Sequence, residues 1–220
     1  MFRDRKDAGQ RLGRALAEYR NQGALVLAIP RGGAEVGFEV AAHLNADFSL
    51  IVSRKLPFPD NPESGFGAIA EDRSTFIYKD AASWVPWEAV ERIARQQRQE
   101  IARRIEVLRG GRPLPTIKGR VVILVDDGIA MGSTMRASIM LCKKKGAKKI
   151  VVGAPVAGAD VAGEIRRIVD EVVILEIPRF FHAVAQVYRN WYDLVDEDVF
   201  NILERWEKRR KGAGHAGKDD

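Results

Sequence analysis

The chain has 220 residues, 46% of them hydrophobic and 30% charged, and a formal net charge of +6. These proportions favour a globular protein of one ordinary domain, and no apolar run is long enough to span a membrane as a helix. Cys142 is the only cysteine, which excludes an intrachain disulfide and a zinc site built from cysteines.

The first seven residues are mostly charged and include no apolar signal segment, so we expect a cytoplasmic protein. The positive excess gathers in two basic clusters, residues 143–149 and 208–211. A charged run is usually a solvated face, and neither cluster contains the aromatic residues that stack on bases. We therefore expect neither a nucleic acid nor a membrane as a partner.

The first fifty residues alternate between helix and strand. Spaced apolar residues predict a helix over residues 4–20, and a wholly apolar run predicts a buried strand over 24–29. After a turn at 30–33, the pattern predicts a helix over 34–44 and a second buried strand over 48–52.

The middle of the chain is less regular. Residues 55–67 contain three prolines and two glycines, which predicts an irregular segment, and residues 68–79 suit a short hairpin or a mobile arm. A long charged helix is predicted over residues 86–108, with Pro86 in its first turn. We define the flap as residues 56–82 and expect it to be flexible.

The second half returns to the alternation of strand and helix. Strands are predicted over residues 120–125, 150–154 and 172–177, with helices over 133–145 and 160–169 between them. This order predicts an α/β fold, in which a doubly wound parallel sheet carries helices on both faces.

After Pro178 the pattern changes to an aromatic-rich segment. We call residues 178–206 the hood and expect it to be a small C-terminal addition to the sheet. The sequence thus predicts one domain over residues 1–207 and a basic, disordered tail over residues 208–220.

The strongest chemical signal follows the apolar strand at residues 121–125. This strand delivers two adjacent carboxylates, Asp126 and Asp127, to its C-terminal end. Ligands bind at that edge of a parallel sheet, and carboxylates can accept hydrogen bonds from sugar hydroxyls.

The loop after the two acids ends at the start of a predicted helix. Gly132 lets a phosphate approach the backbone, and Ser133 and Thr134 add hydroxyl donors. The exposed N–H groups and the dipole of a helix start attract anions. The alternative is a plain strand-to-helix turn in which the Asp residues act as caps.

The stretch Val121–Thr134 resembles the motif of type I phosphoribosyltransferases that binds 5-phosphoribosyl-1-pyrophosphate (PRPP). Three other stretches, in the same order along the chain, are similar to a bacterial and archaeal group of these proteins. They are Phe2–Arg5 with Ala8, Gly9 and Leu12, then Pro30–Gly33, and then Asn61–Glu63 with Gly67 and Ala68.

The resemblance implies a role for each residue of the motif. Asp126 and Asp127 would bind the 2′- and 3′-hydroxyls of the ribose, and would reach Mg²⁺ indirectly, through ribose or water. The following run would wrap the 5′-phosphate and consists of Gly128, Ile129, Ala130, Met131, Gly132, Ser133 and Thr134.

By the same resemblance, Pro30–Gly33 would be the loop that binds pyrophosphate. Arg31 supplies a permanent positive charge, and Gly32 and Gly33 open a backbone nest at a helix start. In the family this loop often carries a cis peptide bond that does not precede proline, which would be Pro30–Arg31 here. The alternative is a tight turn with one surface arginine.

Arg54 and Lys55 follow the second predicted strand and precede the flap. Lys55 resembles basic residues that reach the pyrophosphate in some members of the family, although two solvated charges at a strand end are the alternative. The flap would close over the reacting centre and keep water from the anomeric carbon.

The family reaction displaces pyrophosphate from C1 of the ribose by a nucleophile, usually a ring nitrogen, with Mg²⁺ as the cofactor. Positive charge develops on the sugar and negative charge on the leaving group. The resemblance therefore implies four catalytic residues: Arg31 and Lys55 at the pyrophosphate, and Asp126 and Asp127 at the sugar. A homodimer would match the assembly of many relatives.

One position departs from the family pattern. Where purine-salvage relatives often have an Asp near the base, this chain has Ala130, which cannot accept a proton. We therefore do not expect hypoxanthine or guanine as the acceptor, and the sequence leaves the general base open. His182 is a candidate only by its proximity to the hood aromatics, and a structural histidine is the alternative.

The hood would form the acceptor pocket. By similarity of position, Phe181 would lie over a planar acceptor, where stacking on a nucleobase contributes about 1–3 kcal/mol. The alternative is that this ring packs the hood onto the sheet, since aromatic side chains dominate cores.

Two other functions are compatible with the same fold. One is a PRPP-sensing regulator that binds nucleic acid through a basic cluster, and the other is a hydrolase or synthetase that handles PRPP differently. The presence of Arg31 and Lys55 favours the transferase, because a sensor need not stabilise departing pyrophosphate. No helix-turn-helix pattern flanks the core, which also disfavours a DNA-binding regulator.

Overall fold

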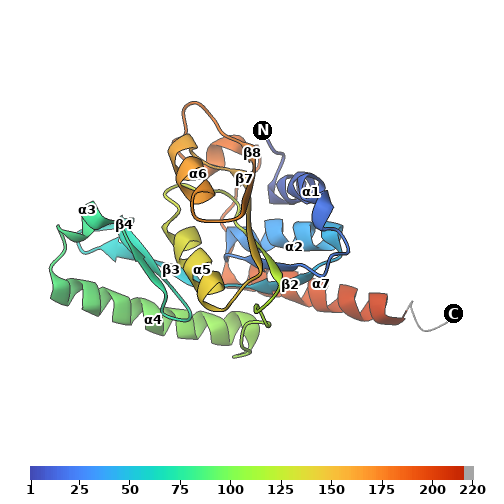
Figure 1. The fold of residues 1–220 in the computed structure, drawn as a ribbon, viewed down its shortest axis with the longest axis horizontal. Helices are drawn as coiled ribbons and strands as arrows, with labels where there is room; N and C mark the ends of the chain where they lie inside the picture. The colour runs from blue at the N-terminus through green and yellow to red at the C-terminus, as the bar shows by residue number, and fades with distance from the viewer. Residues whose placement is uncertain (216–220) are drawn as a thin grey trace.

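The computed structural model describes residues 1–215, and its centre is a parallel sheet of five strands in the order β2-β1-β6-β7-β8 (Figure 1). All four neighbouring pairs are parallel. The strands are β1 (Leu25–Ala28), β2 (Asp47–Leu50), β6 (Val121–Val125), β7 (Lys149–Val156) and β8 (Glu171–Glu176). The structure thus confirms the five predicted strands and the α/β class.

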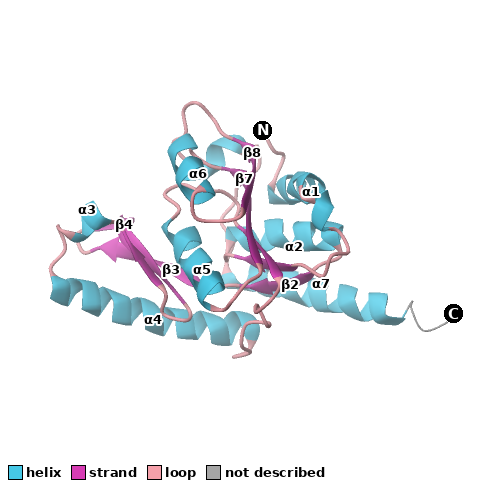
Figure 2. Cartoon of the chain, viewed as in Figure 1, coloured by secondary structure: helices cyan, strands magenta, loops and turns pink. Residues whose placement is uncertain are grey.

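Helices cover both faces of this sheet, which explains why its two central strands β1 and β6 are wholly apolar. Alternate residues of β1 enter two separate cores: Val26 and Ala28 pack with α1, α2 and α7, whereas Leu25 and Leu27 pack with α5 and α6. Figure 2 shows the two helix layers. These helices are α1 (Arg5–Ala15), α2 (Gly32–Leu44), α5 (Ser133–Lys144), α6 (Ala159–Arg166) and α7 (Asp196–His215). A short 3-10 helix, η1 (Ala17–Tyr19), follows α1.

Residues 55–67, predicted as irregular, belong to a second, antiparallel sheet instead, whereas the hairpin alternative for residues 68–79 is confirmed by the antiparallel pairing of residues 67–69 with 75–77. The strands of this sheet, in the order β3-β4-β5, are β3 (Ser53–Phe58), β4 (Asn61–Ala70) and β5 (Thr75–Ile77). Pro57 is tolerated because it lies in the edge strand β3 at a register shift, where a missing N–H costs little. This small sheet packs against α5 of the main body.

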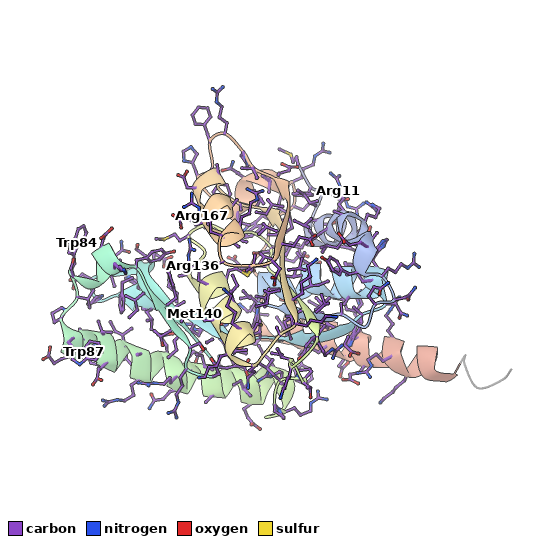
Figure 3. The ribbon with its side chains drawn as sticks, in the orientation of Figure 1. Arg11, Trp84, Trp87, Arg136, Met140 and Arg167 are labelled. Atoms are coloured by element: carbon purple, nitrogen blue, oxygen red, sulfur yellow. The ribbon has the colours of Figure 1, made fainter. Side chains whose placement is uncertain are left out.

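Two helices complete this unit, α3 (Lys79–Ala82) and the long α4 (Trp87–Arg109). Leu56 and Phe66 of the small sheet pack against Val90 and Ile93 of α4 in a separate apolar cluster. The outer end of the unit carries Trp84 and Trp87, both largely exposed and remote from the parallel sheet (Figure 3). Most of the predicted flap consists of paired strands, and its flexibility stays a prediction.

The predicted hood has two structural parts. Residues 178–195 include a short 3-10 helix, η2 (Val184–Val187), whereas residues 196–206 belong to α7. Helix α7 continues through residues 208–215 of the predicted tail, and residues 216–220 lie outside the described residues. The disorder of the tail stays a prediction. Lysine and arginine are good helix formers, and the helix is anchored upstream by Val199 and Trp206 in the main core.

No helix within residues 1–215 has the length and apolar character required to cross a bilayer.

One buried ion pair joins the end of α4 to both sheets. Arg109 forms a salt bridge with Glu71, and the two side chains are 5% and 9% exposed. Arg109 also donates to the Leu50 carbonyl at 3.2 Å, while the Val52 N–H donates to Glu71 at 2.9 Å. The pair therefore ties α4 to the segment that connects β2 with β3.

Replacing Arg109 with Met should lower the free energy of unfolding by about 3–5 kcal/mol, because it leaves the Glu71 carboxylate buried without its partner. Urea denaturation followed by circular dichroism measures this change. The exposed Arg92 on the same helix provides the control, since Arg92→Met should change stability by no more than about 0.5 kcal/mol. A loss below about 1 kcal/mol for Arg109→Met would contradict the structural role of the pair.

Candidate functional site

The predicted phosphate-binding loop lies between β6 and α5, at the C-terminal edge of the parallel sheet. Gly132, immediately before α5, has φ = 75°, a left-handed conformation that favours glycine. No side chain caps the start of α5, so the N–H groups of its first turn remain available to an anion.

A cavity of about 330 Å³ opens beside this loop. Its wall joins the loop to the small sheet, so residues that are far apart in the sequence face one space. The lining consists of Lys55, Glu63, Gly65, Asp126, Gly128, Ile129, Ala130, Met131, Gly132, Ser133, Thr134 and Met135. The structure therefore brings Lys55 together with most of the predicted motif.

The two acids have different surroundings. Asp126 lines the cavity, and its Oδ1 accepts a hydrogen bond of 2.9 Å from the Asp127 N–H. The Asp127 carboxylate forms an ion pair with Arg5 instead, with 2.8 Å between Arg5 Nε and Oδ2. Tyr188 donates its hydroxyl to the Asp127 carbonyl at 2.6 Å and so fixes the backbone there.

Burial raises the pKa of both carboxyl groups above the usual range of aspartate. At Asp126 the negative charge of Asp127 raises the pKa further, whereas at Asp127 the guanidinium of Arg5 opposes the effect of burial. The neighbouring Arg5 cation therefore favours the ionised form of the Asp127 carboxyl group.

The predicted pyrophosphate loop packs directly against the acids. A Cβ atom on Gly32 would collide with the Asp127 carboxylate, and one on Gly33 would lie 2.9 Å from Asp126 Cα. Both positions therefore require glycine for close approach. The Pro30–Arg31 peptide bond is cis, as the resemblance implied.

Arg31 lies at this loop but not in the lining of the cavity. Its side chain is 41% exposed, and its Nη1 is 3.8 Å from Asp196 Oδ1 at the start of α7. Arg103 of α4 pairs with the same carboxylate at 3.2 Å. The arginine is thus positioned beside the acids by its loop, with its charge directed toward α7.

One hydrogen bond joins the small-sheet unit to the phosphate-binding loop, and a second, within the small sheet, positions Lys55. The Tyr78 hydroxyl, just after β5, donates to the Met131 carbonyl at 2.5 Å. Lys55 Nζ donates to the Glu63 carbonyl at 2.5 Å, which holds its charge at the cavity wall. Arg54, its neighbour in β3, is half-buried against Gln97, and burial lowers its pKa.

The hood covers the other side of the loop. A Cβ atom on Gly128 would collide with Val184 of η2, so this part of the loop also needs glycine. Phe181 is partly buried and packs in the same apolar cluster as Phe2, which agrees with the alternative that the ring packs the hood. His182 is exposed, and its backbone N–H donates to Gln186 at 2.8 Å.

Arg5 is the residue of this site that the sequence analysis did not single out. The sequence placed it only within the stretch Phe2–Arg5 that resembles the family, and its partner Asp127 is 122 positions away. A charged N-terminal segment is expected to be solvated, yet the Arg5 side chain is 3% exposed.

Comparison with known proteins agrees with this geometry. A sequence model of the phosphoribosyl transferase domain matches residues 4–190. Proteins from two strains of Mycobacterium tuberculosis, CDC 1551 and H37Rv, both named "Putative phosphoribosyl transferase", are 38% identical over 216 residues. The match covers 97% of this chain but 49% of those proteins, so the chain spans about half the length of the curated relatives it matches.

A solved structure extends the match to three dimensions. The protein TT1426 from Thermus thermophilus is 37% identical, with a TM-score of 0.79, and the alignment covers 93% of this chain and 98% of TT1426. The similarity thus spans both sheets and the loop between β6 and α5. The chain belongs to the phosphoribosyl transferase domain family.

Proposed function

We propose that the protein transfers the 5-phosphoribosyl group of PRPP to a nitrogen nucleophile and releases pyrophosphate. The proposal rests on one observation: Asp126, the uncapped start of α5 and Lys55 all line the same cavity. It offers sugar-hydroxyl acceptors, a phosphate site and a cation side by side, which are the groups a phosphorylated sugar requires.

The donor would bind along this wall. Its 5′-phosphate would meet the N–H groups from Gly128 to Thr134, and the ribose hydroxyls would bind Asp126 and Asp127. The pyrophosphate would extend toward Lys55 and the Arg31 loop. Gly32 and Gly33 support this path, because they let that loop reach the acids without steric conflict.

Bond breaking at C1 leaves negative charge on pyrophosphate and positive charge on the sugar. Arg31 and Lys55 would stabilise the leaving group, while the two carboxylates hold the ribose in line. Aligning the two reactants in one complex replaces a bimolecular step with a step inside that complex, which raises the reaction rate. Excluding water from the site strengthens the electrostatic interactions there and prevents hydrolysis. The small sheet and its bond from Tyr78 to the loop would limit the entry of water from that side.

Mg²⁺ fits this site as a companion of PRPP. Within residues 1–215, no group of three or more His, Cys, Asp or Glu could cage a metal. Mg²⁺ is commonly held by one or two carboxylates with substrate phosphates and water, which suits Asp126 and Asp127. When bound, the ion would neutralise charge on the pyrophosphate.

The proposal defines the acceptor by its chemical class, a nitrogen nucleophile. Phe181 would face a planar acceptor from the hood, and Ala130 supplies no proton acceptor, so we do not propose hypoxanthine or guanine. The regulator is less well supported, since Lys144 pairs with Asp72 at 3.3 Å and Lys149 with Glu171 at 2.8 Å, which leaves less free charge in the first basic cluster.

A pyrophosphate-release assay with PRPP, Mg²⁺ and a panel of bases and amines tests the proposal. The protein should release pyrophosphate with at least one acceptor, and the double variant Asp126→Asn, Asp127→Asn should lose both turnover and PRPP binding, because neutral amides bind sugar hydroxyls more weakly than carboxylates do. Arg92→Met, at an exposed position outside the lining of the cavity, serves as the control for turnover. PRPP binding by the double variant at the strength of the parent would exclude this site.

Gly32→Ala tests the contact between the two loops. The new methyl group would meet the Asp127 carboxylate, so the loop or the acid must shift, and pyrophosphate release should fall by about 10–100-fold. Gly163→Ala in α6 is the matched control, since no atom lies within 4 Å of its new Cβ. Equal rates for the two variants would refute a role for this close approach.

A further inference from the structure

Arg5 is a buried cation that three groups of the site engage at once. Its Nε lies 2.8 Å from Asp127 Oδ2, and its Nη1 donates to the Tyr192 carbonyl at 2.7 Å. The guanidinium carbon lies 4.0 Å from the centre of the Trp191 ring and 5.3 Å from that of Tyr192. One side chain of α1 therefore contacts both the acid pair and the hood.

We propose that Arg5 is a positioning residue, which fixes the carboxylate of Asp127 for the sugar hydroxyls of the donor. This inference rests on the proposed function, because it assigns Asp127 to the ribose. It makes the N-terminal helix α1 a part of the site, in addition to the phosphate-binding and pyrophosphate loops.

The geometry gives Arg5 control over the orientation of Asp127. Asp127 Oδ2 accepts the hydrogen bond from Arg5 Nε, and the same oxygen is the atom nearest to a Cβ placed on Gly32. The orientation of the carboxylate is therefore set by a charge-assisted bond and by close packing on the Gly32 backbone. Held in this way, the carboxylate can accept a bond from a hydroxyl group in a fixed direction.

The guanidinium suits this task better than an ammonium group would. Its planar fork directs one N–H to the carboxylate and another to the Tyr192 carbonyl, while its face rests on Trp191. A lysine would keep the charge but could not satisfy the three contacts together.

Calorimetric titration of Arg5→Gln at pH 7 with PRPP and, separately, with pyrophosphate, each in the presence of Mg²⁺, tests this role. Binding of PRPP should weaken at least about tenfold, because a charge-assisted hydrogen bond that orients Asp127 is lost. Pyrophosphate has no ribose hydroxyls and should bind as it does to the parent. Arg11→Gln is the matched control, because Arg11 lies on the same helix with its side chain 45% exposed (Figure 3). This variant should bind PRPP as the parent does.

Arg5→Lys gives a second test should Arg5→Gln fail to fold, as circular dichroism would show. Because the charge is kept but the planar fork is lost, its affinity for PRPP should fall at least about threefold, and by less than that of Arg5→Gln. Either variant binding PRPP with the affinity of the parent, even with a lowered melting temperature, would leave Arg5 a purely structural role and overturn the proposal. An equal loss of affinity for PRPP and for pyrophosphate would overturn it as well. Failure of the parent itself to bind PRPP would instead refute the proposed function.

Discussion

The contact between Asp127 and Gly32 joins the two loops on which the site depends. One loop follows β1 and the other follows β6, and these strands are neighbours in the sheet. Because Gly32 has no side chain, the carboxylate can rest on the backbone of the facing loop, and Arg5 forms an ion pair with the same carboxylate. A sugar and a pyrophosphate can thus be bound by adjacent surfaces rather than by separate ones.

The fold supplies this adjacency through its topology. Parallel strands end at one edge of the sheet, and the order β2-β1-β6-β7-β8 places β1 beside β6, although 92 residues separate Ala28 from Val121. The small sheet and α4 are inserted within this interval, and the small sheet contributes Lys55 to the cavity beside the phosphate-binding loop. The hood reaches the loop from the opposite side through Val184.

Much of this could be predicted from local sequence. The apolar run at 121–125, the two acids and the glycine before a helix are consecutive, so their pattern contains the phosphate-binding loop without knowledge of the fold. The hairpin over residues 68–79 was among the alternatives that the sequence offered, but the strand β3 could not be predicted, because Pro57 is acceptable there only at an edge and a register shift that the fold defines. The role of Arg5 was also hidden, since its burial depends on aromatic residues near position 190.

A crystal structure of the protein with bound PRPP and Mg²⁺ tests the central claim most directly. Our account places the 5′-phosphate on the N–H groups at the start of α5, the ribose hydroxyls on Asp126 and Asp127, and Arg5 still paired with Asp127. Donor bound elsewhere, with the cavity beside α5 empty, would contradict the account.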